Sequence, residues 1–260
     1  MENYNDIIEK LNNWNFKKIV LFPEGSNYVF LVKLQSDKNH KDEILAIYKP
    51  VSGERPLRDF PNRSLYLREK FAWIISIELG WPNLPPLVIR DGPYGLGSLQ
   101  FYVNSFTSKN YFTERDSRLE DFIYIAAFDV LVNNSDRKGS SCLIDISDNK
   151  IWAIDHGLTF NYFSRIRTVM FEFIDRKYPL KIIDNITKLI YLLENDKKFI
   201  NYANKYITDL ELKSLINRGK NMIEKHSPKR VYTHVKTYGN CNNYEILNED
   251  VYLDWMLENL

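Results

Sequence analysis

Apolar and polar positions are arranged differently in the two halves of the chain, and this difference predicts the fold. Before about position 105, short apolar runs bounded by turn-forming residues predict strands at residues 28–34, 44–48, 87–90 and 97–103. A polar segment joins the first two runs and predicts a hairpin, and the sequence DGPYG predicts a turn between the last two. We therefore expect the first part of the chain to be mostly sheet.

Helical spacing of apolar residues marks the remaining elements. A short helix is expected at residues 7–14 and a longer one at 65–79, where Gly80 is placed to cap the C-terminal end. After position 119 the pattern becomes mainly helical. It predicts helices at residues 121–132, 182–193, 198–207 and 210–223.

Together these elements predict an α+β protein with two lobes. The sheet-rich lobe would take residues 1–105 and the helical lobe residues 106–260, with the boundary near residues 103–109. A cleft between two lobes is a common place for a small-molecule site. The segment 227–260 has a mixed pattern that assigns it no element.

Charge and composition narrow the classes of function. The formal net charge is +1, from 35 basic and 34 acidic side chains, so no overall field attracts nucleic acid or an anionic membrane. Cys142 and Cys241 show no metal-ligand spacing, and so few cysteines are typical of a reducing cytoplasm. The N-terminal residues lack the apolar core of a signal peptide, and no run reaches the roughly 20 apolar residues of a membrane helix. We therefore expect a cytoplasmic protein without integral membrane segments.

Lys49 is the first candidate for chemistry, because it ends an apolar run and is followed by Pro50, which we expect to end the strand. In kinases, a strand lysine contacts nucleotide phosphates and pairs with a glutamate of the next helix. Glu69 lies in the next predicted helix. Taken alone, Lys49 and Glu69 are better explained as solvated surface residues. Their order along the chain, together with two acidic motifs further on, favours a nucleotide site.

A possible phosphate-binding turn precedes the first predicted strand. Gly25, Ser26 and Asn27 would turn backbone amides toward phosphates. An ordinary turn at the start of a strand explains these residues equally well. The segment is neither a Walker loop nor the three-glycine loop of protein kinases, and the absence of GxxxxGK[ST] argues against P-loop chemistry.

The first acidic motif is NNSDRKGSSCLID, residues 133–145. Its two asparagines tolerate a tight turn after the apolar helix, and Asp136 follows, flanked by Arg137 and Lys138. A carboxylate between two cations stays ionised and can orient the proton of a substrate hydroxyl, while Lys138 could stabilise charge on a transferring phosphate. A polar turn with a local ion pair is the alternative explanation.

The second acidic motif is IWAIDHGLTF, residues 151–160. Asp155 follows an apolar run, and we expect Gly157 to bend the backbone so that the carboxylate points into a cleft. Carboxylate oxygens suit magnesium shared with nucleotide phosphates. An Asx turn that closes a hairpin is the alternative. His156 is not expected to bind metal because the other histidines show no ligand spacing, and the lack of GxSxG argues against a hydrolase triad.

With these residues in view, the chain resembles a bacterial family related to phosphatidylinositol 3-/4-kinases. The resemblance spans roughly residues 25–173 and rests on GSNYVFLVKL, LAIYKPVSGERPLRDFP, LYLREKFAWIISIELGW, PPLVIRDGPYGLGSLQFYV, FDVLVNNSDRKGSSCLI and IWAIDHGLTF. A DR pair with a third basic residue, then an apolar strand and IDHG, is fairly specific to this lipid-kinase-like branch. Protein kinases typically have HRD and DFG in these places.

The resemblance implies a protein-kinase-like two-lobed fold that binds ATP and Mg²⁺. It implies a role for each candidate: Lys49 contacts phosphates, Glu69 holds Lys49, Asp136 is the catalytic aspartate, Asp155 binds magnesium, and Gln100, Phe101 and Val103 belong to the hinge under the adenine. The chain departs from the family at two places. Lys138 replaces a histidine, and Ser141 replaces the metal-binding asparagine, which makes Ser141 a weaker second metal ligand.

The sequence therefore predicts an ATP-dependent phosphotransferase that acts on an unidentified hydroxyl acceptor, which could be a protein, a lipid or a small molecule. A nucleotide-binding pseudokinase and an AMP-transferring enzyme of the same fold remain as alternatives. Lys138 and Ser141 are the residues that favour a pseudokinase. A third hypothesis, nucleic-acid binding, depends on the basic and aromatic segment SPKRVYTHVK at residues 227–236. The segment is short and the chain nearly neutral, so no nucleic-acid partner is expected.

Overall fold

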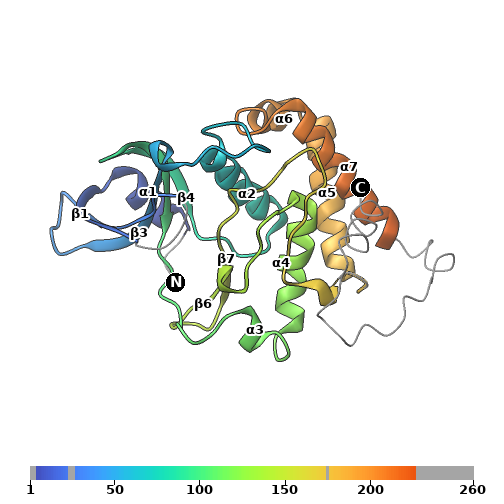
Figure 1. Ribbon diagram of the computed structural model, residues 1–260, viewed down its shortest axis with the longest axis horizontal. Helices are drawn as coiled ribbons and strands as arrows, with labels where there is room; N and C mark the ends of the chain where they lie inside the picture. Colours follow the sequence, from blue (N-terminus) through green and yellow to red (C-terminus); the bar gives the residue numbers. More distant parts are fainter. Residues whose placement is uncertain (1–3, 23–26, 174–175, 227–260) are drawn as a thin grey trace.

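The computed structural model describes residues 4–22, 27–173 and 176–226. Figure 1 shows a sheet at one end of the molecule and a group of helices at the other, so the predicted α+β organisation is confirmed. The sheet is antiparallel, and its strands lie in the order β1-β2-β3-β5-β4. The elements of this end are α1 (Tyr4–Asn13), β1 (Asn15–Leu21), β2 (Phe30–Gln35), β3 (Glu43–Pro50), β4 (Leu87–Gly92) and β5 (Gly95–Phe101).

The first strand of the sheet, β1, was not predicted. Its sequence NFKKIVL has no strict alternation, and most of its side chains are exposed. The strand forms because its backbone pairs with β2, from Asn15 opposite Gln35 to Leu21 opposite Phe30, with one irregularity near Phe16. Pairing with a neighbour, rather than burial of side chains, therefore decided this element.

The predicted hairpin is confirmed as β2 and β3, and β3 ends at Pro50, as expected. β3 includes Pro50, which lies opposite Gly97 of β5. Proline is tolerated here because the register of β2 with β3 ends at Tyr48, so no β2 residue faces Pro50. A Cβ on Gly97 would lie 2.5 Å from the Lys49 carbonyl oxygen, so only glycine fits beside this lysine.

The second end of the molecule is mostly helical. The helices predicted near residues 65–79, 121–132, 182–193, 198–207 and 210–223 are all confirmed, with small shifts of their ends. A four-residue helix, α3, was not predicted. The elements are α2 (Leu65–Leu79), α3 (Tyr111–Glu114), α4 (Leu119–Val132), β6 (Cys142–Ile144), β7 (Ile151–Ala153), α5 (Leu180–Asn195), α6 (Lys197–Ala203), α7 (Asp209–His226) and the short 3₁₀ turns Val51–Gly53, Gly139–Ser141 and Phe171–Phe173.

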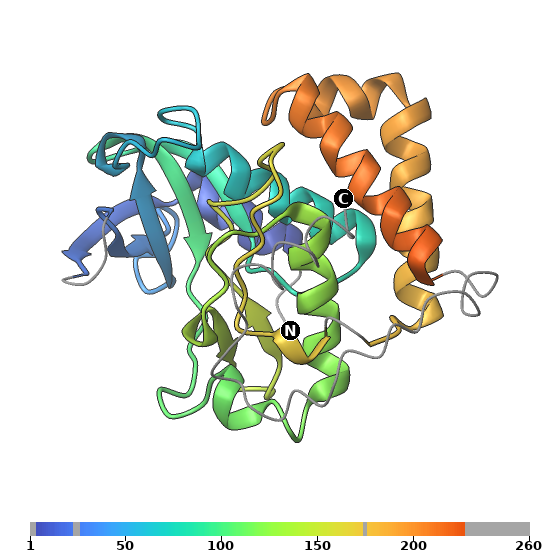
Figure 2. The ribbon, with the colours of Figure 1, turned by 45° about the vertical axis from the view of Figure 1, so that its right-hand side comes forward.

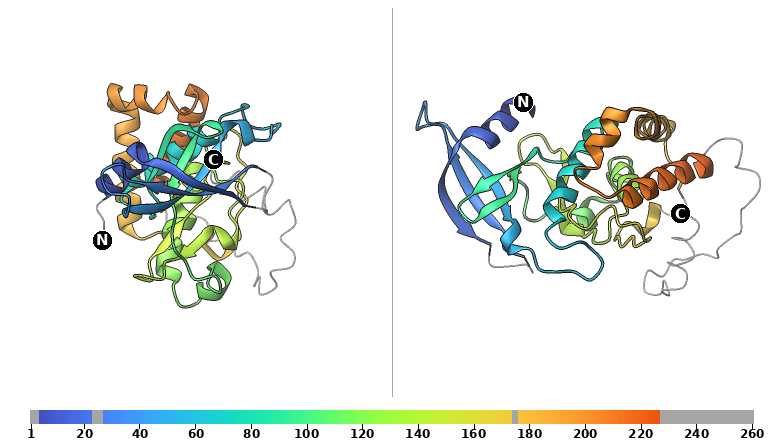
Figure 3. Two further views of the ribbon diagram at one scale, coloured as in Figure 1. Left: turned by 90° about the vertical axis from the view of Figure 1, so that its left-hand side faces the viewer. Right: turned by 90° about the horizontal axis from the view of Figure 1, so that it is seen from above.

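Helix α2 lies between the sheet and the helices α5 and α7, as Figures 1 and 2 show. By its place in the chain it belongs to the sheet-rich part. Its buried apolar residues, however, join the core of the helical part with α4, α5 and α7. A separate, smaller core lies between α1 and the sheet and contains residues such as Val32, Leu34 and Leu99. The views in Figure 3 show the sheet and α1 together at one end.

The sequence of α2 explains this position. Apolar residues surround the helix on nearly every side, as expected of a buried helix rather than a surface one. Gly80 ends the helix in a left-handed conformation with φ +74°, and its N–H donates to the Ile77 carbonyl, so the predicted cap is confirmed. Among the residues described, no helix is both long and apolar enough to cross a membrane.

Candidate active site

Lys49 stands at the centre of the candidate site. Its Nζ lies 2.7 Å from Glu69 Oε1 on α2 and 3.4 Å from Asp155 Oδ1, which follows β7. The second oxygen of Glu69 accepts a hydrogen bond from Ser98 at 3.3 Å. Ser98 lies opposite Lys49 in the sheet register. Residues far apart in the sequence, from both lobes, thus meet at one ammonium group.

The charges around Lys49 are mutually stabilising. Burial acts to lower the pKa of Lys49, but the carboxylates of Glu69 and Asp155 outweigh burial and raise it, so the ammonium is charged at neutral pH. In return, Lys49 is the main cause of a lowered pKa for Asp155, against the opposing effect of burial. Both groups therefore hold the charges that a phosphate and a metal ion require.

Asp155 has an unusual backbone conformation, with φ +66°. Non-glycine residues with positive φ are uncommon and cluster at functional sites. The backbone does bend at Gly157, but Asp155 itself, and not Gly157, takes the left-handed conformation. The turn leaves the Asp155 side chain 49% exposed although the adjacent His156 is buried.

A hard divalent cation fits Asp155. The carboxylate is ionised, exposed and one hydrogen bond away from the predicted phosphate-contacting lysine. Within the described residues, no group of three or more His, Cys, Asp or Glu could hold a metal by itself. This arrangement suits magnesium, which usually binds one or two carboxylates together with substrate phosphates.

Asp136 is held in the loop that follows α4. Asn133 ends α4 in a left-handed conformation, and the Asp136 N–H donates to Asn134 Oδ1 at 3.0 Å. The Asp136 carboxylate is 39% exposed and pairs with Lys138 at 2.8 Å. A substrate hydroxyl can therefore reach the carboxylate from solvent, with a cation close by.

Arg137 does not flank Asp136 as a catalytic cation, so that expectation is corrected. Its guanidinium is buried and binds both oxygens of Asp129 on α4, at 2.7 and 2.9 Å. It also donates to the carbonyls of Ser141 and Ile154. Arg137 therefore joins the loop of Asp136 to the segments on either side of the β6–β7 hairpin.

His156 completes this buried cluster. Its Nε2 lies 2.7 Å from the Arg137 guanidinium, which is always a donor, so Nε2 acts as the acceptor and the ring is neutral. Burial is the main cause of a pKa well below the usual histidine value, and the Arg137 charge adds to it. Asp136 precedes Arg137 in the chain and Asp155 precedes His156, so each aspartate is next to one member of this buried contact.

Asp129 is a site residue that sequence reasoning missed. It receives hydrogen bonds from Arg137 and, at 2.9 Å, from Asn134 Nδ2. The available signal was an aspartate inside the apolar run of residues 122–132, which must find a buried partner. The sequence alone did not name Arg137 as that partner, because Asp136 lies directly beside Arg137 and Asp129 lies eight residues earlier in the chain.

Ser141 lies in the 3₁₀ turn after Lys138 and is buried, with 4% of its surface exposed. Its carbonyl is already occupied by Arg137 and by the Ile154 N–H. The Ser141 backbone therefore connects Arg137 to the segment after β7, and the role of the Ser141 hydroxyl as a metal ligand stays a prediction.

The predicted hinge has two unused backbone groups. The Phe101 N–H donates to Pro86 at 2.8 Å, but proline has no N–H to return to the Phe101 carbonyl. Among the described residues, the Val103 N–H also has no acceptor. Gln100 is buried, and its side chain points to the Pro85 carbonyl. One acceptor and one donor, two residues apart, are therefore available to a ligand.

The predicted phosphate turn is only partly described. Gly25 and Ser26 lie outside the described residues. The Asn27 side chain ties the turn to the segment after β3, because its Oδ1 accepts the Arg55 N–H at 2.9 Å. Its role at the nucleotide stays a prediction.

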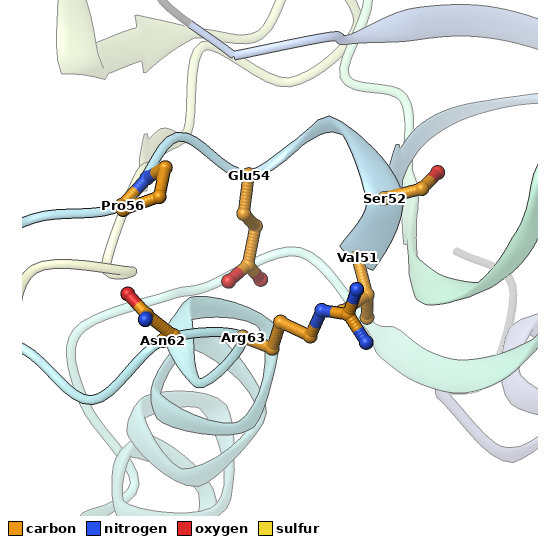
Figure 4. Close-up of a pocket in the computed structure, with 6 residues that line it drawn as sticks. All are labelled: Val51, Ser52, Glu54, Pro56, Asn62 and Arg63. Carbon is orange, nitrogen blue, oxygen red and sulfur yellow. The ribbon is translucent and has the colours of Figure 1, made fainter.

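A surface pocket of about 300 Å³ lies on the connection between β3 and α2. Figure 4 shows the Glu54 carboxylate pointing into the space between the two arms of this connection. Glu54 accepts hydrogen bonds from the first N–H groups of α2, at Leu65 and Tyr66. The pocket contains none of the predicted site residues and is lined by Val51, Ser52, Glu54, Pro56, Asn62 and Arg63.

Comparisons with known proteins identify the fold. No protein-family model matches the chain. Protein Rv2133c of Mycobacterium tuberculosis is 33% identical over 181 aligned positions, which take in 55% of this chain and 64% of the relative's length.

Solved structures of kinases are similar over most of the chain. A Golgi casein kinase with Mn/ADP bound has a TM-score of 0.58 at 15% identity and covers 92% of this chain and 80% of its own. A hydra Fam20 with sugar has a TM-score of 0.57 at 13% identity, covering 88% and 91%. At such identities the likeness shows the fold alone, and it confirms the predicted protein-kinase-like arrangement.

Proposed function

We propose that this protein is a Mg-ATP-dependent phosphotransferase of the phosphatidylinositol 3-/4-kinase-like branch. The observation that carries the proposal is the Lys49 ammonium held between Glu69 at 2.7 Å and Asp155 at 3.4 Å. A lysine and glutamate in these positions, with an exposed ionised aspartate from the helical lobe beside them, are the parts that a kinase uses to hold nucleotide phosphates and metal. The solved Golgi casein kinase with Mn/ADP shares this fold and supports the same ligands here.

The nucleotide would be held at two places. Lys49, kept in place by Glu69, would contact the phosphates, and Asp155 would hold magnesium. The Phe101 carbonyl and the Val103 N–H would bind the edge of the adenine, since Pro86 has no N–H to donate to Phe101 and the Val103 N–H has no acceptor among the described residues. Bound magnesium would supply positive charge to the phosphate oxygens.

Asp136 would orient the acceptor hydroxyl and take up its proton. Lys138 would then share its charge between Asp136 and the phosphoryl group in transfer. Most of the rate enhancement would come from holding both reactants in line, because the buried Arg137–Asp129 contact fixes the loop that carries Asp136. The acceptor could be a protein, a lipid or a small molecule.

Nucleotide binding is the first test. We expect ATP to raise the melting temperature of the protein, and to raise it further with magnesium. Lys49→Met should remove this shift, whereas Lys33→Met should keep it. Lys33 is a matched control because it pairs with Glu43 at the same 2.7 Å but on the exposed surface of the same sheet. If no nucleotide shifts the melting curve, the proposal is wrong.

Transfer is the second test. With ATP labelled at the γ-phosphate, we expect label in protein or acceptor, and Asp136→Asn should lower the rate by about 100-fold or more while ATP still binds. Label from the α-phosphate instead would identify an AMP-transferring enzyme.

A pseudokinase is the second candidate, and the burial of Ser141 favours it. With Ser141 enclosed, Asp155 is the one predicted metal ligand that is exposed. A pseudokinase would bind ATP and show no hydrolysis, phosphoryl transfer or AMP transfer. Ser141→Asn should then restore or raise transfer, because the amide oxygen is the stronger ligand.

A further inference from the structure

The residue before Glu69 in α2 points in a different direction and meets the helical lobe. Arg68 is buried, and its guanidinium binds the carboxylate of Glu211 in the first turn of α7. The same guanidinium donates to the Thr159 carbonyl at 2.7 Å. Adjacent residues of α2 therefore contact the predicted phosphate lysine on one side and α7 on the other.

Glu211 is itself held rigidly. Its Oε2 accepts the Thr208 N–H at 2.9 Å, and the Thr208 hydroxyl accepts the Glu211 N–H at 3.3 Å. This reciprocal arrangement is a capping box at the start of α7. One carboxylate oxygen is thus used to build the helix end, and the other is left to bind Arg68.

The Thr159 contact connects Arg68 to the segment of Asp155. Thr159 lies four residues after Asp155, and its hydroxyl donates to the His156 carbonyl at 2.8 Å. Helix α2 is therefore joined to this segment at two points, through Lys49 at the cleft and through Arg68 in the interior. A rotation of α2 that removes Glu69 from Lys49 would also break the buried contacts of Arg68.

We infer that Arg68 and Glu211 are positioning residues that fasten α2 to α7 and so hold Glu69 on Lys49. The inference rests on the proposed function for its effect on the nucleotide, but its mechanical part does not. Because both side chains are enclosed, at 1% and 4% exposed, water does not compete for the contact. The apolar side chains of α2 pack in the same core as α7 and reinforce the attachment.

A double-mutant cycle tests the inference on nucleotide affinity. We expect Glu211→Gln to weaken ATP binding by ~10- to 100-fold, since small displacements at such sites have effects of this size. In a Glu69→Gln background, Glu211→Gln should have no further effect, because the two residues act through one contact. Additive losses would overturn the inference and show that Glu211 only supports general stability.

Two further variants grade the effect if Glu211→Gln folds poorly. Arg68→Lys keeps a positive charge near Glu211. Thr208→Ala changes an exposed residue and removes the hydroxyl that caps α7 beside Glu211. Both should weaken ATP binding less than Glu211→Gln does. Ile190→Ala in α5 is the control for lost stability, because it removes a buried side chain away from Arg68 and Glu211. At temperatures well below the melting temperature of this variant, its ATP affinity should be unchanged. Equal weakening in Ile190→Ala would overturn the inference.

The acylation rate of Lys49, followed by mass spectrometry, is a readout that needs no nucleotide. In the wild type, the Lys49 Nζ is engaged by Glu69 at 2.7 Å and by Asp155 at 3.4 Å, and an engaged amine reacts slowly. Glu211→Gln should raise the acylation rate of Lys49 several-fold relative to Lys33, and Ile190→Ala should not. An unchanged rate would overturn the inference. If the protein binds no ATP but Glu211→Gln still raises the acylation rate of Lys49, the proposed function is wrong and the positioning role of Glu211 stands.

Discussion

The sheet and the loops of the helical lobe satisfy their buried backbone groups in different ways. In the sheet, each strand pairs with its neighbour, and the core under α1 is apolar, with Val32 and Leu34 fully enclosed. The segments that carry Asp136 and Asp155 have almost no strand or helix, yet they are also enclosed. In the described part of the chain three arginines are buried, and each donates to backbone carbonyls of these segments or of the residues next to them. The pairs are Arg137 with Ser141 and Ile154, Arg68 with Thr159, and Arg218 with Leu131 and Asn161.

The difference shows what a buried segment without regular secondary structure requires. Buried carbonyls need donors, and a loop cannot supply them from a ladder. Arginine offers several donors in a fixed plane and stays charged, so one side chain can bind carbonyls from two segments. Two of these arginines also have a buried carboxylate partner, Asp129 or Glu211, which offsets the burial of the charge.

Removing an arginine should have the largest effect. Arg137→Ala leaves Asp129 buried without its cation and the Ile154 carbonyl without its arginine donor, so we expect a loss of about 3–5 kcal/mol in the free energy of unfolding. Urea denaturation measures it. Arg118→Ala is the control, because Arg118 pairs with the exposed Asp121 and should lose about 1 kcal/mol or less. Equal losses would show that burial of the contact is unimportant.

Opening a cavity in the sheet core should have a somewhat smaller and more local effect. Leu34→Ala removes a fully buried side chain under α1, and we expect a loss of about 2–5 kcal/mol. Hydrogen exchange should accelerate in β2 and β3 before it does so in α4, because the two cores are separate clusters. Simultaneous acceleration in α4 would show that the two cores unfold as one unit.

Lys70 also donates to a backbone carbonyl, but unlike the buried arginines it can lose its proton at moderately high pH. It donates to the Leu87 carbonyl at the start of β4, and burial lowers its pKa from 10.5 to about 8. Between these pH values the unfolded chain binds more protons, so stability should rise with pH from about 8 to 10.5. Allowing for partial exposure, we expect a rise of about 2 kcal/mol in the free energy of unfolding.

The Lys70→Met variant should lose this rise, and Lys33→Met should keep it, because the Lys33 side chain is exposed. Urea denaturation at several pH values distinguishes them. A rise that persists in Lys70→Met would assign it to other groups.

The exposed pair of Lys138 and Asp136 should give the smallest change in stability. We expect Lys138→Ala to alter the free energy of unfolding by less than about 1 kcal/mol, since solvent screens the pair. Phosphoryl transfer should nevertheless fall in the same variant. A large loss of stability would place Lys138 with the buried arginines instead.

Much of the fold could be predicted because its elements have local signals. The apolar runs of β2 and β3, the helical spacing of α4 and the glycine after α2 all lie in the residues themselves. β1 could not be found in this way, since its pattern is that of an exposed segment and pairing with β2 defines it. The contacts of Arg137 could not be found either, because Asp136 is its neighbour in sequence and Asp129 is its partner in space.

The sequence by itself determined the order of the candidate groups, Lys49, Glu69, Asp136 and Asp155, and the division into sheet and helices. These follow from local periodicity and from the chemistry of single side chains. Only the tertiary structure decided which charges meet. It placed Glu69 and Asp155 on one ammonium, turned Arg137 away from Asp136, and joined α2 to α7 through Arg68. Pairing of charges depends on distances between segments and on burial, and neither is written in the local pattern.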